Sequence, residues 1–469
     1  MEHDTKNKKL LYAIFIISIG TFLTKLMSFV MTPFYASWLS TSEYGIYDLI
    51  ATYVPLCIPF ATLQLDQAIY RFCMEKRYNP NTIYRKVIKI VLPLMAIVTI
   101  IITVIMILLR LDVMIIIGFI SYFVTFALYN LSSEYLRGNN LLKEYSICNI
   151  IVGFTIVIAS IILVRGFSLG VAGMLFVFSI SYSLSLIIIL IKFKPYVEGN
   201  EENAITSKEL LNYSIPLIPN SISWWITNVS DRTIIMFFQG SFYNGIYAIS
   251  CKIPTMLSMV FSIFNLSFQQ VALQSTNDKD IEDYYNQLIK KVIRVLFSGS
   301  TVIVSATSII YYSLLAEDYW QGIPCVPILL CGAIMLSLAQ YIGDILLVDK
   351  QTKIIGLSTM IGALFNIILN LILIPRYDII GASVATLVSY VLMFFIRFFK
   401  IKHKFIVRNV VGYILNYLLI FIGVSAFVIL FGNNTLVNVL IFIASVICFF
   451  ALNKDLITPI VSKVFGGRK

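Results

Sequence analysis

The sequence has little charge, few histidines and no long polar stretch. Only 13% of its 469 residues are Asp, Glu, Lys or Arg, whereas 59% are hydrophobic and the mean hydropathy is +0.89. A soluble globule of this length needs more polar surface than this chain can supply. The composition therefore excludes a soluble protein and predicts an integral membrane protein.

Residues that commonly carry out chemistry are scarce or scattered. The two histidines, His3 and His403, lie in a terminal tail and a basic loop, and the seven cysteines have neither disulfide nor metal-ligand spacing. The chain also has no Gly-rich phosphate loop and no nucleophile elbow. We therefore expect a protein that is not an enzyme and that has no cofactor and no metal site.

Long apolar runs dominate the chain, and most reach the roughly 20 residues that cross a bilayer. The first run is too long for a signal-peptide core and lacks a cleavage site, so it is expected to remain as a span. Fourteen spans are predicted, at about 10–36, 44–70, 88–109, 113–133, 146–164, 169–191, 211–238, 244–271, 292–313, 323–348, 354–374, 379–399, 409–431 and 435–452. The expected fold is an all-α polytopic membrane protein.

Positive charge is distributed unequally between the two ends of these spans. Of the 35 Lys and Arg residues, 29 fall on one side, including the run from Arg397 to Arg408, and only Arg110, Arg165 and Arg376 fall on the other. Because cytoplasmic loops retain positive charge, both termini are predicted to be cytoplasmic. The formal charge of +11 lies beside apolar segments, so membrane lipids, and not nucleic acid, are the expected counter-charge.

Short sequence matches indicate an internal repeat. Gly45-Ile46-Tyr47 recurs as Gly245-Ile246-Tyr247, and Gly173 with Ser181-Tyr182 recurs as Gly381 with Ser389-Tyr390. We expect two parallel six-helix lobes around a shared cavity. The predicted division is an N-terminal lobe at 1–192, a cytoplasmic linker at 193–210, a C-terminal lobe at 211–400, and two extra helices with a cytoplasmic tail at 401–469.

Polar residues recur at helical spacing in the first two spans of each lobe. The first span carries Ser18, Thr21, Lys25, Ser28 and Thr32 on one face. Such faces either line a cavity or form seams of small residues between packed helices. The seventh span adds three candidates for the substrate site: Asn220, Trp224 and Asn228. The Trp224 ring is able to stack on a sugar.

Six charged residues lie well inside spans: Lys25, Asp66, Asp231, Arg232, Lys252 and Asp344. A charge at the centre of a span costs about 3 kcal/mol on insertion scales, so these side chains should face a cavity or one another. The cations are candidates for binding an anionic headgroup, and the aspartates for carrying a coupling ion or proton. Asp231 and Arg232 are adjacent and point about 100° apart on a helix, so we expect no ion pair within that helix and at least one of them free for a ligand or an opposite-lobe partner.

Several segments together are similar to one family. They are Leu39 to Gly45 (LSTSEYG), Ala68 to Phe72, Leu136 to Gly138, Ser214 to Pro219, Ser230 to Arg232, and Asn366 and Asn370 followed by Ile374-Pro375, Gly381-Ala382 and Ser389-Tyr390. In this order the chain resembles, over about residues 10–400, the bacterial polysaccharide transporters. These are the oligosaccharide flippases of the multidrug/oligosaccharidyl-lipid/polysaccharide exporter superfamily.

The resemblance implies a flippase of the bacterial plasma membrane that works by alternating access. It would move polyprenyl-diphosphate-linked oligosaccharide from the inner to the outer leaflet for O-antigen, capsule or exopolysaccharide assembly, together with a polysaccharide polymerase and chain-length machinery. The cationic cavity of the family would map onto Lys25, Arg232 and Lys252, although three acids inside the spans balance them. The alternatives are a drug or cation antiporter of the same superfamily and a membrane glycosyltransferase or polymerase, which the short outer loops disfavour.

Overall fold

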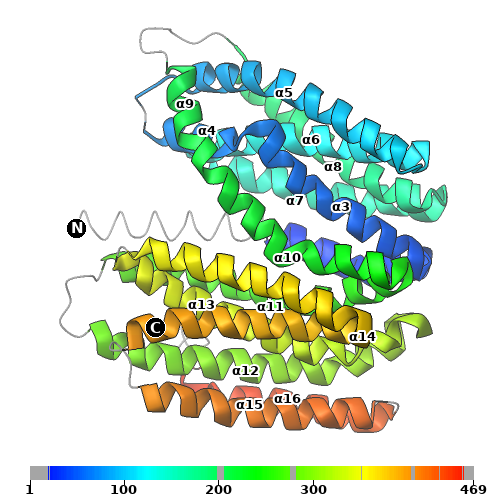
Figure 1. The fold of residues 1–469 in the computed structure, drawn as a ribbon, viewed down its shortest axis with the longest axis vertical. Helices are drawn as coiled ribbons and strands as arrows, with labels where there is room; N and C mark the ends of the chain where they lie inside the picture. The colour runs from blue at the N-terminus through cyan, green and yellow to red at the C-terminus, as the bar shows by residue number, and fades with distance from the viewer. Residues whose placement is uncertain are drawn as a thin grey trace, which may run out of the picture. The chain divides into compact units, whose positions relative to one another are not determined.

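The computed structural model describes residue 20 and residues 22–75, 77–197, 205–274, 281–349, 351–402, 407–432, 434–456 and 458. These residues form helices joined by turns (Figure 1). The chain divides into two compact units, unit 1 (Met1–Thr233) and unit 2 (Ile234–Lys469), and the division falls within one helix, α10 (Ile218–Phe238). The predicted lobe boundaries, with a linker at 193–210, remain a prediction.

Unit 1 contains the helices up to the first part of α10. Residues 22–30 are helical and precede the first named helix. The elements are α2 (Thr32–Trp38), α3 (Thr41–Thr62), α4 (Leu65–Met74), α5 (Pro80–Leu108), α6 (Val113–Gly138), α7 (Leu142–Ser160), the π-helical turn η1 (Ile161–Gly166), α8 (Gly170–Phe193), α9 (Ser207–Ser214) and the 3₁₀ turn η2 (Ile215–Leu217).

Unit 2 contains the end of α10 and the remaining helices. They are α11 (Gly240–Gln274), α12 (Ile281–Leu314), the 3₁₀ turn η3 (Glu317–Gly322), α13 (Cys325–Val348), α14 (Thr352–Ile401), α15 (Val407–Leu430) and α16 (Thr435–Leu452). In the described part of the chain, eleven helices are long and apolar enough to cross a membrane. The polytopic all-α fold is thereby confirmed, while the count of fourteen spans and the orientation of the termini stay predictions.

The predicted second span, 44–70, is two helices. Its start is fixed by a capping box in which the Ser40 hydroxyl accepts from the Glu43 backbone N–H and the Glu43 carboxylate accepts from the Ser40 N–H. The helix breaks at Leu63 and Gln64, four and five residues after Pro59, and these two residues have φ of 51° and 57°. Two consecutive left-handed residues cannot continue an α-helix, so Asp66 lies on the separate helix α4.

Two glycines of the predicted repeat allow tight connections in their respective units. A Cβ on Gly173 would lie 3.3 Å from the Leu163 carbonyl oxygen, and a Cβ on Gly381 would lie 2.5 Å from that of Leu373. In α14 the chain kinks at Asp378, whose φ is 50° and ψ is −135°. At each position a side chain would meet nearby backbone, which glycine avoids.

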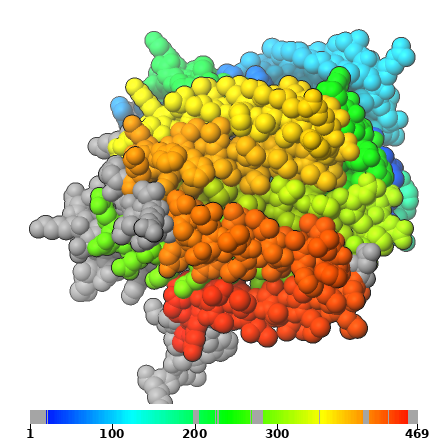
Figure 2. All heavy atoms as spheres, turned by 60° about the horizontal axis from the view of Figure 1, so that its bottom comes forward, coloured from blue at the N-terminus to red at the C-terminus, as the bar shows by residue number. Residues whose placement is uncertain are grey.

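The last two helices of unit 2 pack against α12. They are exposed on one face of the unit (orange to red in Figure 2). Arg294 of α12 donates to both carboxylate oxygens of Asp455 at 2.6 and 2.7 Å, and the Asn453 amide donates to the Ser298 hydroxyl at 3.0 Å. Polar contacts therefore fix the C-terminal end of α16 to α12.

Replacing Gly381 with alanine tests the tight connection in α14. We expect Gly381→Ala to destabilise the protein by about 1–3 kcal/mol, because its new methyl group meets backbone. Gly356→Ala, on the same helix with open space around the Cα, should be neutral or stabilising by up to about 1 kcal/mol. Thermal unfolding of the detergent-solubilised variants measures both effects, and equal midpoints for the two would contradict the packing described here.

Candidate functional site

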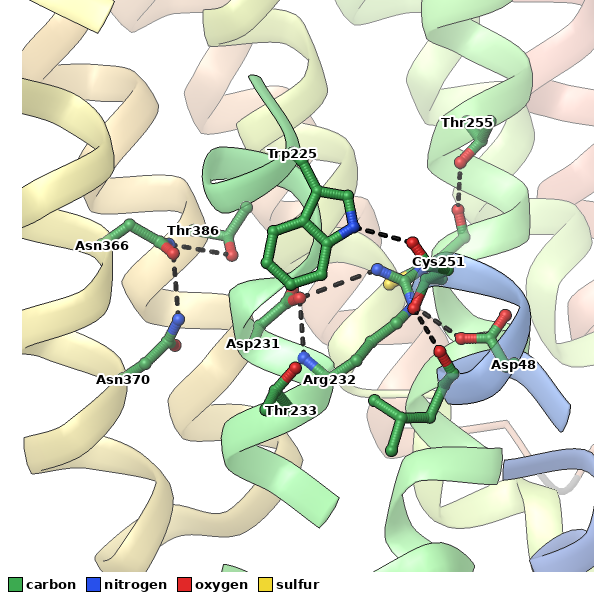
Figure 3. Close-up of polar contacts among 12 residues, drawn as sticks. Asp48, Trp225, Asp231, Arg232, Thr233, Cys251, Thr255, Asn366, Asn370 and Thr386 are labelled. Carbon is green, nitrogen blue, oxygen red and sulfur yellow. Dashed lines mark hydrogen bonds and ion pairs between the residues drawn. The ribbon is translucent and has the colours of Figure 1, made fainter. Parts of the chain in front are cut away.

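Arg232 of α10 is held between two carboxylates in unit 1. Its Nε donates to Asp48 Oδ2 of α3 at 2.6 Å, and its Nη1 lies 3.6 Å from Asp231 Oδ1 (Figure 3). Asp48 and Asp231 are only 4% and 6% exposed. Two carboxylates thus contact the one guanidinium.

The expectation that Asp231 and Arg232 do not pair within the helix is wrong. The two Cα–Cβ bonds diverge, but the arginine side chain is long enough to bring its guanidinium back to the neighbouring carboxylate. The same Asp231 oxygen also accepts the Arg232 backbone N–H at 2.8 Å. Arg232 also pairs with Asp48, which lies in the predicted N-terminal lobe, so the expected opposite-lobe partner is present. Sequence reasoning did not include Asp48 among the buried charges.

Aromatic and hydroxyl groups join the same two helices beside this centre. Trp225 Nε1 donates to the Thr52 carbonyl at 2.7 Å, and the Tyr53 hydroxyl lies 3.0 Å from Thr233 Oγ1. The ring centroids of Tyr53 and Trp225 are 5.3 Å apart. The side chains of the predicted sugar contacts Trp224 and Asn228 lie outside the described part of the chain. Trp225, next to Trp224, is the tryptophan that contacts α3.

Lys25 lies on the helical stretch 22–30 and is exposed. The neighbouring face of this stretch packs against α7, where the Thr24 hydroxyl donates to the Asn149 carbonyl at 2.6 Å and Gly153 leaves room for Met27 and Thr24. Among the described residues, no hydrogen bond or ion pair to Lys25 is found. Asn220 is likewise exposed, on α10, whereas Ser18 and Thr21 of the predicted polar face lie outside the described residues.

The remaining buried charges of unit 2 have different surroundings. Lys252 is half-buried on α11, and Asp344 is buried on α13, where it attracts Arg397. The charge pattern counts Arg397 among the cations at the cytoplasmic end of its span, and in the structure this residue is buried, at 5% exposed. It donates to the Ala339 carbonyl, the Ser358 hydroxyl and the Thr359 hydroxyl at 2.8, 2.9 and 2.9 Å. Arg397 thus joins α13 to both parts of α14.

An amide network also joins the two parts of α14. Asn370 Nδ2 donates to Asn366 Oδ1 at 3.0 Å, and Asn366 Nδ2 approaches Thr386 Oγ1 at 3.4 Å (Figure 3). Both asparagines are buried. Their spacing of four in an apolar helix is the sequence signal for this network.

Unit 2 also contains an apolar cavity that sequence reasoning missed. Its volume is about 670 Å³, and its walls come from α12, α13, α14 and α15. Residues that line it include Phe297, Cys331, Met335, Phe394 and Phe421. Side chains so far apart in sequence give no local pattern that would reveal such a cavity.

Comparison with known proteins places the chain in a family. A family model described as polysaccharide biosynthesis protein matches residues 10–271, more than half of the chain. The chain belongs to the polysaccharide biosynthesis protein family. Its match to the probable low-salt glycan biosynthesis flippase Agl15 of Haloferax volcanii has 28% identity and covers 50% of each protein. An uncharacterized membrane protein of Methanocaldococcus jannaschii, MJ1068, is 22% identical over 92% of both chains.

Solved structures show which fold this polysaccharide biosynthesis protein has. The lipid II flippase MurJ in an inward closed conformation has a TM-score of 0.71 and 18% identity, over 94% of this chain and 100% of that one. An outward-facing MATE family transporter of the MOP superfamily has a TM-score of 0.58 and 14% identity, over 84% and 96%. The chain is a multi-pass membrane protein with the fold of these structures, that of the MOP superfamily.

A double-mutant cycle measures the Asp48–Arg232 ion pair. Asp48→Asn and Arg232→Gln should each destabilise unit 1, because each leaves a buried charge without its main partner. The loss in free energy of unfolding of the double variant should be smaller than the sum of the two single losses, by up to about 3 kcal/mol. Thermal unfolding of the purified protein measures all three losses.

The matched control is Arg71–Glu75, a pair whose side chains are 54% and 38% exposed. Water screens this pair, so its cycle should give a coupling near zero. Similar coupling in the two cycles would refute the view that burial makes the Asp48–Arg232 pair strong.

Proposed function

We propose that this protein is a flippase for lipid-linked oligosaccharide. Its cargo is a polyprenyl-diphosphate-linked repeat unit, moved from the inner to the outer leaflet by alternating access for surface polysaccharide such as O-antigen, capsule or exopolysaccharide. The observation that carries the proposal is the family match over residues 10–271. The names of Agl15 and MurJ, both flippases, support it.

The charges of unit 1 suggest how an anionic headgroup would be received. Of the three predicted cations, Lys25 is the exposed one and is the proposed first contact for the diphosphate. Lys252, half-buried in unit 2, stays a predicted contact. Arg232 is already paired with Asp48 and Asp231. An anion binds it well only when a carboxylate gives way, so cargo and Asp48 compete for one guanidinium. That competition would link cargo binding to a change in the α3–α10 contact.

Other parts of the molecule fit the rest of the cargo. Asn220 and the predicted Asn228 and Trp224 are proposed sugar contacts, and the apolar cavity against α15 can take up hydrocarbon chains. A polysaccharide polymerase and chain-length machinery are proposed partners. The proposed location is a bacterial plasma membrane.

A drug or cation antiporter is the second candidate. The observation that favours it is the pair of buried carboxylates, Asp48 and Asp231, that contacts Arg232, because carboxylates attract a cationic ligand. The fold does not decide the matter, because it is shared with MATE family transporters.

Depletion of the protein in its host distinguishes the two candidates. We expect polyprenyl-linked repeat units to accumulate in the inner leaflet, as measured by mass spectrometry with a leaflet-selective probe. Wild-type protein should relieve the accumulation, and Lys25→Ala should do so at least about tenfold less well, since loss of one charge-assisted hydrogen bond costs about 1.5–3 kcal/mol.

Lys353→Ala, which removes an exposed lysine at the start of α14, is the control and should behave as wild type. Equal amounts of each variant in the membrane must be confirmed by blotting. If no lipid-linked intermediate accumulates, the flippase proposal fails, and efflux of cationic dyes becomes the assay of choice.

A further inference from the structure

A second charged cluster lies inside unit 1, between α4 and α6. Asp66 of α4 is 4% exposed. Its Oδ2 accepts from Gln67 Nε2 at 2.9 Å, whereas its Oδ1 is fully buried and accepts no hydrogen bond within the described part of the chain. The amide of Asn130, on α6, lies beside the same carboxyl group. A buried carboxylate oxygen without a donor is costly unless something else neutralises it.

A second carboxylate adds to that cost. Glu134, one turn along α6 from Asn130, is 6% exposed and close enough to Asp66 for the two charges to repel. Arg137 donates to both oxygens of Glu134, at 2.6 and 2.9 Å, and lies over the Tyr70 ring at 4.6 Å from its centre. One guanidinium thus serves one of the two acids. The cluster retains a charge of −1 at Asp66.

The scaffold around the two acids is tightly packed. A Cβ on Gly138 would lie 2.6 Å from Cys73 Cβ and 3.0 Å from the Tyr70 carbonyl oxygen, so α4 and α6 are in close contact. This contact joins two segments of the family resemblance, Ala68 to Phe72 and Leu136 to Gly138. The carboxyl groups are therefore brought together by the fold rather than by a flexible loop.

Among the described residues of the neighbouring elements, no cation forms an ion pair with Asp66. Arg71 bonds Glu75 and lies over Tyr213 of α9, Lys86 of α5 donates to the Ile205 carbonyl, and Glu209 of α9 accepts from Thr206. Other titratable groups on the elements packed against α4 include Tyr84, bonded to Ser132, Tyr135, bonded to Asn81, the half-buried Arg85, and the exposed Lys89 and Lys208. Arg137 attracts the Glu134 carboxylate, and the carboxylates of Asp66 and Glu134 repel each other.

We propose that Asp66, paired with Glu134 and flanked by Asn130 and Gln67, is a proton-binding site of unit 1 whose loading is coupled to transport. This rests on the proposed transport function. A proton fits better than a metal cation, because both Glu134 oxygens are engaged by Arg137 and too few oxygen ligands remain for a sodium ion. Binding adds H⁺ to the Asp66 carboxylate, and release returns the anion, so charge is balanced without any other reactant.

Infrared difference spectroscopy tests proton binding independently of transport. Wild-type protein at neutral pH should show the carbonyl band of a protonated carboxyl group, which Asp66→Asn removes. Asp112→Asn, at an exposed N-cap of α6, is the control and should retain the band. If Asp66→Asn has the same band as wild type, the proton site is refuted. Asp66→Glu should restore the band, which separates loss of the site from misfolding.

Proteoliposomes test the coupling. With a fluorescent polyprenyl-diphosphate disaccharide as probe, a gradient of one pH unit should shift its distribution between leaflets by up to about tenfold in wild type and Asp112→Asn. Asp66→Asn should flip the probe without responding to the gradient. A response to a sodium gradient that Asp66→Asn abolishes would assign the site to sodium and overturn the proton proposal. If no protein flips the probe, the proposed function and the coupling fail together, while the infrared band still decides whether Asp66 binds a proton.

Discussion

The cost of placing charge inside a helical bundle controls this structure. Each buried acid or base needs a counter-charge or several dipoles, because the surrounding hydrocarbon offers none. Arg397 meets this need with two hydroxyl groups and a backbone carbonyl, all within unit 2. Arg232 meets it with two carboxylates. The first arrangement fixes helices in place. The second places two carboxylates beside one guanidinium, and a charged ligand can interact with these groups.

The breaks between helices determine where these charges lie. Had α3 continued through Leu63 and Gln64, Asp66 would face a different direction and could not meet Asn130 and Glu134 of α6. The kink at Asp378 likewise returns the second part of α14 so that Arg397 reaches Ser358. Two left-handed residues and one kink, rather than the long regular helices, therefore position the polar groups.

Hydrophobic length predicted the all-α membrane fold, because it is a property of the chain itself. The family was predicted from the resemblance of short segments such as Leu39 to Gly45. Sequence patterns also identified Asp66, Asp231, Arg232 and Asp344 as buried or nearly buried charges. Partners were harder to predict, since the Asp48–Arg232 pair joins residues 184 positions apart. The burial of Arg397 was not predicted, because arginine near the end of an apolar run is usually a boundary residue, and only tertiary contacts show that it is buried.

The carboxylates at the two centres of unit 1 bear on the choice between an anionic and a cationic cargo. At the first centre two carboxylates contact the Arg232 guanidinium, whereas at the second Arg137 is paired with Glu134 and Asp66 lies near that pair. A proton at Asp66 would neutralise that carboxylate, whereas at the first centre the Arg232 guanidinium becomes available to an anion only when a carboxylate contact is lost. An anionic cargo would therefore be attracted to Arg232 only after Asp48 had been displaced, and a cationic one would be attracted at once. The strength of the Asp48–Arg232 pair thus sets how strongly an anionic cargo must compete.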